Sequence, residues 1–541
     1  NQLSTNQSLG VKVATPVGNL VGQLLFGWLA DVLGRKRMYG VELMIMIVAT
    51  FGQALAGQAP AVSAIGVIIV WRFIMGVGIG GDYPLSAIIS SEFAATRSRG
   101  RLMTAVFAAQ GWGNLAAAIV AIIVVQAYKT SIIAAPFPAV VPVDYCWRLL
   151  IGLGCVPGVV ALYFRLTIPE TPRFTMDIER NVAQATADIE NVLTSGKHVE
   201  EDAIVQRVNA PKASRADFAA YFGQWKNMKV LIGTAYSWFA LDIAFYGLGL
   251  NSSIILTAIN FGNPSGLKSS SLYVYQNLYN ISVGNLILSL AGLIPGYWAS
   301  FLVIDSWGRK PLQLMGFAVL TVLFAIMGFA YDALNASTAG KNAFVFLYCL
   351  ANFFQNFGPN TTTFVIPGEA FPTRYRSTAH GISAATGKLG AVISQVGFAQ
   401  LVNIGGTGKF VQHIMEIFAF FMLTGVFSTL LLPETKQRSL EDISQEEQEG
   451  YIQDAPPSDP TNGSQKQLIF GEGAGMKQRL PAGEENGGGP GGEDPQHSAF
   501  AEPSKPSDLA PRDNPKKQLT GNQEENPQAV LRKPSQQKSK L

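Results

Sequence analysis

The sequence predicts an all-α membrane protein that crosses the bilayer many times. Of its 541 residues, 48% are hydrophobic and only 14% are charged, whereas a soluble chain usually carries about 25% charged residues. The hydrophobic residues gather in runs of roughly 20, the length that an α-helix needs to cross a bilayer. The net charge of +3 gives no indication of nucleic-acid binding.

Eleven apolar runs follow one another along the chain. Five lie in a predicted amino-terminal transmembrane half at 1–173, and six lie in a carboxy-terminal half at 228–436. The polar segment at 174–227 is expected to be a loop that joins the halves. Residues 437–541 are rich in Gly, Pro, Gln, Lys and Glu, a composition typical of a disordered tail. The runs cover residues 11–30, 38–55, 64–90, 103–125, 147–166, 230–250, 281–304, 311–331, 343–365, 379–402 and 410–432.

Three short motifs occur twice. D-x-x-G-R-K occurs at 31–36 and 305–310, E-x-x-x-T-R-x-R at 92–99 and 369–376, and P-E-T at 169–171 and 433–435. The copies keep their order and nearly the same spacing, so we expect two homologous halves related by a parallel repeat. In the second half D-x-x-G-R-K follows the second run, but in the first half it follows the first. We therefore expect a parent architecture of twelve helices, whose first span precedes residue 11.

Basic residues indicate the orientation. They cluster at 35–37, 97–101, 309–310 and 374–376 and in the loop at 174–227, while the opposite loops hold few. Because cytoplasmic loops carry the excess of Lys and Arg, the central loop and the tail are predicted to be cytoplasmic. The three cysteines show no ligand spacing, and no metal site is predicted.

One carboxylate, Asp242, lies in the middle of the sixth apolar run. A charged Asp at the centre of a membrane helix costs about 2.5–3.5 kcal/mol on insertion scales. Trp238 and Tyr246 lie one helical turn away on either side of it, so an acceptor is flanked by two donors on one face. This pattern indicates a substrate or proton site, and the alternative is a structural Asp bonded to a neighbouring helix.

The whole of residues 1–436 resembles the major facilitator superfamily, for which D-x-x-G-R-K is a characteristic loop. R-x-x-x-G-x-G-x-G at 72–80 and P-E-T are shared with its sugar porters. G-G-D-Y-P-L-S at 80–86, A-L-D-I-A-F-Y at 240–246 and N-F-G-P-N-T-T-T at 356–363 resemble the phosphate:proton symporter family of fungi and plants. The paired glutamines that sugar porters usually carry in this region are absent between residues 230 and 250.

The resemblance implies a plasma-membrane transporter, rather than an enzyme, that moves inorganic phosphate with protons and needs no cofactor. It assigns Tyr83, Gln110 and Asn356 to substrate binding, where they would join the candidate acceptor Asp242 and its neighbouring donors Trp238 and Tyr246. Phosphate is both a donor and an acceptor, so a selective site needs both kinds of group. Lys388, inside a predicted span, is expected to supply positive charge. Polar groups that only join helices, and a Lys reaching the membrane interface, are the alternatives.

Asp82 is the candidate proton carrier beside Asp242, because it precedes Tyr83 in a glycine-rich span. Arg72 is expected to pair with Asp82 and to release it when the proton arrives; a purely structural Asp82–Arg72 pair is the alternative. A sugar or other organic-anion symporter and a non-transporting sensor are the competing functions.

The repeated D-x-x-G-R-K loops are expected to latch one conformation rather than to touch substrate. Asp31 and Asp305 would bind basic residues or helix ends of the facing half. A solvated turn is the alternative. The gating residues in these loops are Asp31, Gly34, Arg35, Asp305, Gly308 and Arg309.

Overall fold

A computed structural model describes residues 3–177, 214–258, 270–406, 408–440 and 443 of the chain. Helices account for all of the regular secondary structure in these residues, which confirms the predicted all-α class. Within the described part of the chain, eight helices or runs of consecutive helices are long and apolar enough to cross a membrane.

The first half contains five of the predicted spans. Each begins and ends within seven residues of the expected limits, and the fifth consists of two consecutive helices. The elements are α1 (Thr5–Leu33), α2 (Arg35–Ala54), α3 (Ala64–Phe93), α4 (Arg99–Ala127), α5 (Lys129–Ala134), α6 (Val140–Leu153), α7 (Cys155–Thr167) and α8 (Pro172–Asp177).

The second half contains six spans. Its second span carries a π-helical turn, η2, and its fourth is divided between α17 and α18. The elements are α10 (Arg215–Gly223), α11 (Trp225–Gly249), α12 (Ser252–Ala258), α13 (Ser271–Leu288), η2 (Ser289–Leu293), α14 (Ile294–Trp307), α15 (Arg309–Phe329), α16 (Tyr331–Asn335), α17 (Thr338–Asn356), α18 (Pro359–Ala370), α19 (Arg376–Leu401) and α20 (Val411–Leu430).

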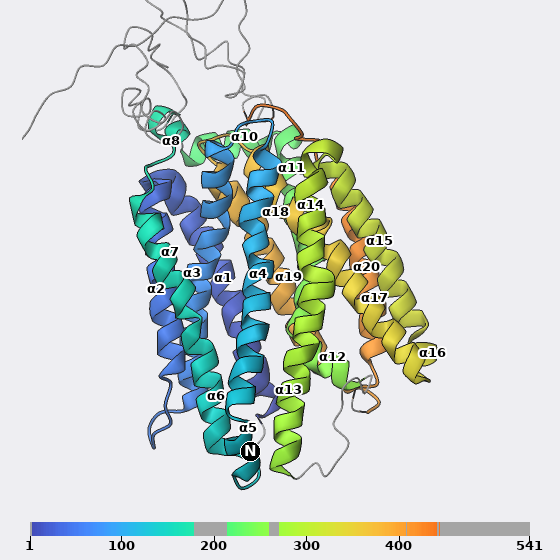
Figure 1. Ribbon diagram of the computed structural model, residues 1–541. Coiled ribbons are helices and arrows are strands. Elements are labelled where there is room, and N and C mark those ends of the chain that lie inside the picture. Colours follow the sequence, from blue (N-terminus) through green and yellow to red (C-terminus); the bar gives the residue numbers. More distant parts are fainter. Residues whose placement is uncertain (1–2, 178–213, 259–269, 407, 441–442, 444–541) are drawn as a thin grey trace, which may run out of the picture. The chain divides into compact units, whose positions relative to one another are not determined.

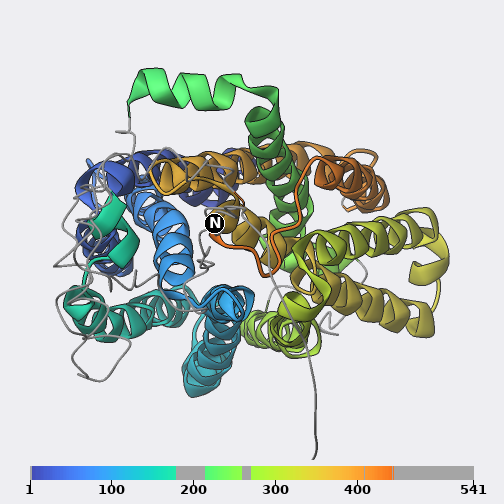
Figure 2. The same cartoon turned by 90° about the horizontal axis from the view of Figure 1, so that it is seen from above.

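The spans run side by side in one bundle (Figure 1), with α8 and α10 at one end and α5, α12 and α16 at the other. Seen along the bundle, the helices of the first half lie on one side and those of the second half on the other (Figure 2). The halves meet through two equivalent helix pairs, α1 with α19 and α14 with α4. These pairs exchange places under the sequence repeat, so the interface has the two-fold character that the repeated motifs predict.

Glycines allow α1 and α3 to approach closely. A Cβ atom added at Gly18 would lie 2.1 Å from the carbonyl oxygen of Phe73, and one added at Gly80 would lie 2.3 Å from that of Asn19. Small residues at such contacts let backbones pack directly, which is the usual way that membrane helices associate. The glycine series at 76–81 is therefore explained by packing of α3 against α1.

The spans that are too polar for a simple hydropathy test are nevertheless helical. α19 contains fifteen buried residues, several of them polar, because it lies among α1, α11 and α18 rather than facing lipid alone. The α17–α18 span is interrupted at Phe357–Gly358, where Gly358 has φ 162° and ψ −124°. Gly316 of α15 packs against this break, since a Cβ there would lie 2.4 Å from Cδ of Pro359.

Two segments outside the spans pack on the bundle. In the region predicted to be a loop, α10 runs along the outer edge of the bundle (Figure 2), and Phe222 contacts Phe371. Beyond P-E-T, Leu440 and Ile443 are buried, so the packed chain extends into the region that was assigned to the tail. The remainder of both regions, 178–213 and 444–541, lies outside the described residues.

Candidate functional site

A buried ion pair joins two helices of the second half at the middle of the bundle. Nζ of Lys388 on α19 lies 2.8 Å from Oδ2 of Asp242 on α11, and each side chain is only 1% exposed. The helices approach closely here, because a Cβ added at Gly387 would lie 2.6 Å from Cδ1 of Trp238. The predicted carboxylate and the predicted cation are therefore direct partners, and they neutralise each other away from water.

Aromatic rings from both halves surround this pair. Nζ of Lys388 lies 4.7 Å from the ring centroid of Tyr83 and 4.6 Å from that of Tyr246, with Trp238 at 6.0 Å. Rings at these distances attract a cation through their negative faces. Tyr83 belongs to α3 and the others to α11, so the Lys388 ammonium group connects the two halves.

A chain of polar side chains crosses from the first half to the second nearby. Tyr297 on α14 donates to Oε1 of Gln110 at 2.8 Å, and Asn360 donates to the Tyr297 hydroxyl at 2.9 Å. Asn360 also donates to Oδ1 of Asn356 at 2.7 Å. Phe107 stands between this chain and Tyr83, since its ring packs on those of both Tyr297 and Tyr83. All seven predicted substrate residues therefore lie in, or one contact from, the same inter-half core.

The predicted partner of Asp82 is wrong. Arg72 instead donates to the carbonyl of Val11 at 2.8 Å, whereas Asp82 lies 2.8 Å from Nη1 of Arg165 on α7. The same Nη1 atom lies 2.6 Å from Oε1 of Glu42 on α2, whose side chain is fully buried. One guanidinium group thus bridges two carboxylates, one residue away from Tyr83.

The first D-x-x-G-R-K loop forms hydrogen bonds with the facing half. Asp31 accepts hydrogen bonds from the backbone N–H groups of Ser377 at 3.3 Å and Thr378 at 2.7 Å, in the first turn of α19. A carboxylate at a helix amino terminus is stabilised by the helix dipole and by these free donors. Arg35 lies 3.2 Å from Asp31 and donates to the carbonyl of Thr373 in the facing half.

The second loop repeats this arrangement in the opposite direction. Asp305 accepts from the backbone N–H of Arg101 in the first turn of α4 at 3.0 Å, and it pairs with Arg309 at 3.0 Å. The close approach depends on Gly100, because a Cβ there would lie 2.4 Å from Oδ1 of Asp305. Both loops therefore contact the facing half, and their role in gating stays a prediction.

The P-E-T carboxylates complete the two loops. Glu170 accepts from the backbone of Arg35 and Lys36, and Glu434 accepts from Arg309 and Lys310. Gly34 and Gly308 have φ of 101° and 103°, and a Cβ at either would lie 2.6 Å from the carboxylate. Burial raises the pKa of the Glu170 carboxyl, while the N–H groups of Thr171 and Lys36 oppose that rise.

Comparison with known proteins identifies the family. The profile of the family described as "Sugar (and other) transporter" matches residues 1–446. The chain belongs to this family of the major facilitator superfamily. The transporter is 50% identical over 465 residues to a repressible high-affinity phosphate permease of Neurospora crassa, covering 82% of this chain and 80% of the relative. It is also 50% identical over 461 residues to the inorganic phosphate transporter PHO84 of Saccharomyces cerevisiae, covering 80% and 76%.

Plant proteins and a solved structure agree with this placement. A probable inorganic phosphate transporter 1-8 of Oryza sativa subsp. japonica is 38% identical over 461 residues, covering 82% of this chain and 83% of the relative. The proton:xylose symporter XylE, bound to 6-bromo-6-deoxy-D-glucose, superposes with a TM-score of 0.62 at 20% identity. That match covers 82% of this chain and 90% of the other, and it supports the fold of the transporter.

Sequence reasoning missed three polar residues of the transporter's interior. Glu42 lies within an apolar run, so the rule that singled out Asp242 would also have found it. Arg165 stands at the end of its run, where a basic residue is ordinary. Tyr297 carries no such signal, because a Tyr in a membrane helix is ordinary until its partners are known. Its role as a link between Gln110 and Asn360 depends on the inter-half packing alone.

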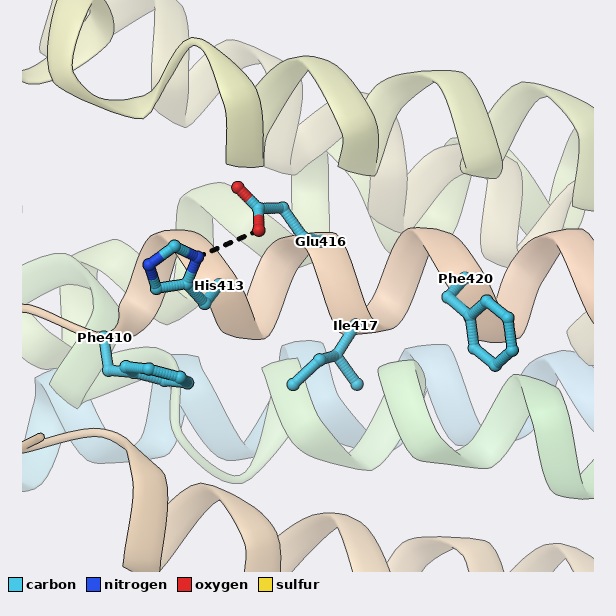
Figure 3. A pocket seen from close by; sticks show the side chains of 5 residues that line it. All are labelled: Phe410, His413, Glu416, Ile417 and Phe420. Carbon is cyan, nitrogen blue, oxygen red and sulfur yellow. Dashed lines mark hydrogen bonds and ion pairs between the residues drawn. The ribbon is translucent and has the colours of Figure 1, made fainter.

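A separate surface pocket lies on α20 and does not belong to this interior (Figure 3). It is open, and it is lined by Phe410, His413, Glu416, Ile417 and Phe420. Nδ1 of His413 lies 2.9 Å from Oε2 of Glu416, and Phe420 is 61% exposed. Its lining comes from one helix and the residue before it, and none of the candidate transport residues contributes to it.

Proposed function

We propose that the transporter moves inorganic phosphate together with protons into the cell by alternating access. The proposal is supported by the names of the fungal and plant relatives and by the interior site. Lys388, Tyr83, Tyr246 and Trp238 are donors, and Asp242 is an acceptor. Phosphate near neutral pH presents both oxygen acceptors and an O–H donor, so this combination is complementary to it.

One observation carries the mechanism: the Lys388–Asp242 pair is neutral and buried before substrate arrives. Phosphate would bring at least one negative charge into a site that cannot disperse it in water. Desolvation of that charge is costly unless a cation or a proton enters with it. Proton coupling is therefore the expected solution for a site of this kind.

Asp82 and Glu42 are proposed to hold the coupled proton. Two carboxylates that share Arg165 carry one uncompensated negative charge, and a proton on either of them would remove it. Protonation of either carboxylate would weaken its ion pair with Arg165. It would also weaken the contacts among α2, α3 and α7, the helices that supply the three groups. Tyr83 follows Asp82 directly in α3, so a conformational change at Asp82 would move a residue of the proposed substrate site.

We further propose that the end with the D-x-x-G-R-K loops faces the cytoplasm, in the plasma membrane. The excess of Lys and Arg at this end supports the assignment. Asp31 and Asp305 would then close the cytoplasmic side while the site is loaded from outside. Their release would let the two halves rock apart at that end.

The test is transport by the purified full chain in proteoliposomes. Labelled phosphate should accumulate when the interior is made alkaline, and a protonophore should abolish accumulation. Competition with unlabelled sugars, organic anions and phosphate addresses the rival substrates. Binding of phosphate without net uptake would favour a sensor, and displacement by a sugar or organic anion alone would reject phosphate as substrate.

A further inference from the structure

A second basic site lies at the opposite end of the bundle from the D-x-x-G-R-K loops. Lys12 is in the third turn of α1, whose other end carries Asp31. Its Nζ donates to Oδ1 of Asn251 at 2.7 Å, just beyond α11 in the facing half. Asn251 is 1% exposed, so this lysine head group points between the halves and not into lipid. A lysine that reaches for the membrane interface would not make this contact.

Among the described residues, no carboxylate lies within 4.0 Å of the Lys12 ammonium group to compensate its positive charge, and its hydrogen-bond partner is a neutral amide. Arg72 of α3, in the same half, donates to the carbonyl of Val11, the residue before Lys12. Two cations beside one turn of α1 create a positive potential that attracts anions.

Hydrogen bonds connect Lys12 to the interior site. Asn251 donates to Oε1 of Gln395 at 3.2 Å, and Gln395 donates to the carbonyl of Tyr246 at 2.8 Å. The Tyr246 ring lies 4.6 Å from Nζ of Lys388. Gln395 is two helical turns from Lys388 on α19, or about 10 Å along the helix axis. A short chain of hydrogen bonds therefore connects Lys12, on the outer side, to the Lys388–Asp242 pair that is proposed to bind phosphate.

We propose that Lys12 is an outer anion-binding station, at which a tetrahedral oxyanion such as phosphate pauses before it reaches Lys388. The ammonium group leaves Asn251 and binds the arriving anion, and Asn251 recaptures it once the anion has moved inward. The inference rests on the proposed phosphate transport. Lys12 contributes to the initial binding of substrate and not to the later conformational change between the two halves.

The test compares initial rates of labelled phosphate uptake by the full chain and by variants at Lys12. Lys12→Gln removes the charge but keeps an N–H donor that can reach Asn251, so it should raise the KM for phosphate roughly three- to tenfold and leave Vmax near that of wild type. Lys12→Arg should restore the KM. The KM of wild type should rise with ionic strength, and that of Lys12→Gln should rise much less.

A matched control separates capture at Lys12 from a general loss of positive charge at this end. Lys341→Gln, in the first turn of α17 at the same end, also removes one positive charge, and its KM should stay within about twofold of wild type. An unchanged KM in Lys12→Gln, or a rise in Lys341→Gln equal to that in Lys12→Gln, would overturn the proposal. Failure of wild type to take up phosphate would instead overturn the proposed function.

Discussion

At the scale of single residues, Asp242 illustrates how much a lone charge in an apolar run can predict. The cost of such a charge indicates a substrate or proton site, and the structure shows that Asp242 is paired at 2.8 Å with Lys388 of a neighbouring helix. Spacing along one helix could not supply this pairing, because Lys388 belongs to another helix. The same limit explains why Arg72 was paired wrongly with Asp82: Arg165 comes from α7, far along the chain.

Asp242→Asn tests the role of the acceptor. Loss of a hydrogen bond to a charged group costs about 1.5–3 kcal/mol, so phosphate affinity should fall about ten- to a hundredfold. Sulfate near neutral pH has no O–H to donate, so the preference for phosphate over sulfate should narrow. Asp242→Glu should also bind poorly, because an added methylene displaces the carboxylate in a site packed against Gly387.

Binding of labelled phosphate and sulfate to purified variants at one pH provides the measurement. The control is Asp332→Asn in α16, which removes an exposed carboxylate and should leave both affinities unchanged. Equal affinities for Asp242→Asn and wild type, with equal discrimination, would make Asp242 a structural residue only.

Asp82→Asn separates proton coupling from substrate binding. The substitution keeps the size of the side chain and mimics the protonated carboxyl, so accumulation driven by a pH gradient should be lost. Exchange of internal for external phosphate needs no net proton movement and should survive. Proteoliposomes loaded with phosphate allow both measurements on the same preparation. If Asp82→Asn accumulates phosphate with the pH dependence of wild type, the proton is carried elsewhere.

At the scale of elements, the sequence predicted the spans well because membrane crossing sets their length and composition. The break at Gly358 was not predicted, although a Gly-Pro pair commonly ends one helix and begins the next. Asn352, Asn356 and Asn360, spaced four residues apart, form a chain of contacts across that break, with Asn356 donating to the carbonyl of Asn352 at 2.7 Å. The packing of Gly316 against Gly358 and Pro359 holds the break in place.

Gly80→Ala tests the close contact between α1 and α3. The added Cβ would lie 2.3 Å from a backbone oxygen, so the helices must separate, at a cost of about 1–3 kcal/mol for overpacking. The apparent melting temperature of the detergent-solubilised protein should fall by several degrees. Gly113→Ala on α4 is the matched control, because nothing lies within 4 Å of its Cβ position. Equal melting temperatures for the two variants would contradict the packing explanation.

At the scale of the whole molecule, repetition of three motifs was enough to predict two related halves and a latch between them. The sequence could not show which helix ends the latch would use. Asp31 reaches α19 and Asp305 reaches α4, and these partners are equivalent only when the two-fold arrangement of the bundle is known. The repeat therefore predicted the symmetry, and the structure supplied the contacts.

Asp31→Asn should loosen the latch. An amide oxygen accepts weaker hydrogen bonds than a carboxylate, and a loss of about 1.5–3 kcal/mol would shift the open-to-closed ratio by roughly ten- to a hundredfold. Spin labels at the exposed positions Arg37 and Trp307, one in each half, should report a larger population at long distance. Asp332→Asn in the same labelled background should leave the distances unchanged. If the distribution of distances between the spin labels is the same in Asp31→Asn as in the unsubstituted protein, Asp31 does not hold the two halves together.

The two latches are alike in plan but unequal in strength. On the α19 side, Arg376 adds an ion pair to Glu92 at 3.0 Å, with side chains that are 1% and 0% exposed. On the α4 side, the equivalent Arg99 donates to the carbonyl of Arg438, and Arg101, which lies 4.0 Å from Asp305, is 49% exposed. We therefore expect the interface between α4 and α14 to separate before the interface between α1 and α19. The substrate would then leave the protein beside α4 and α14.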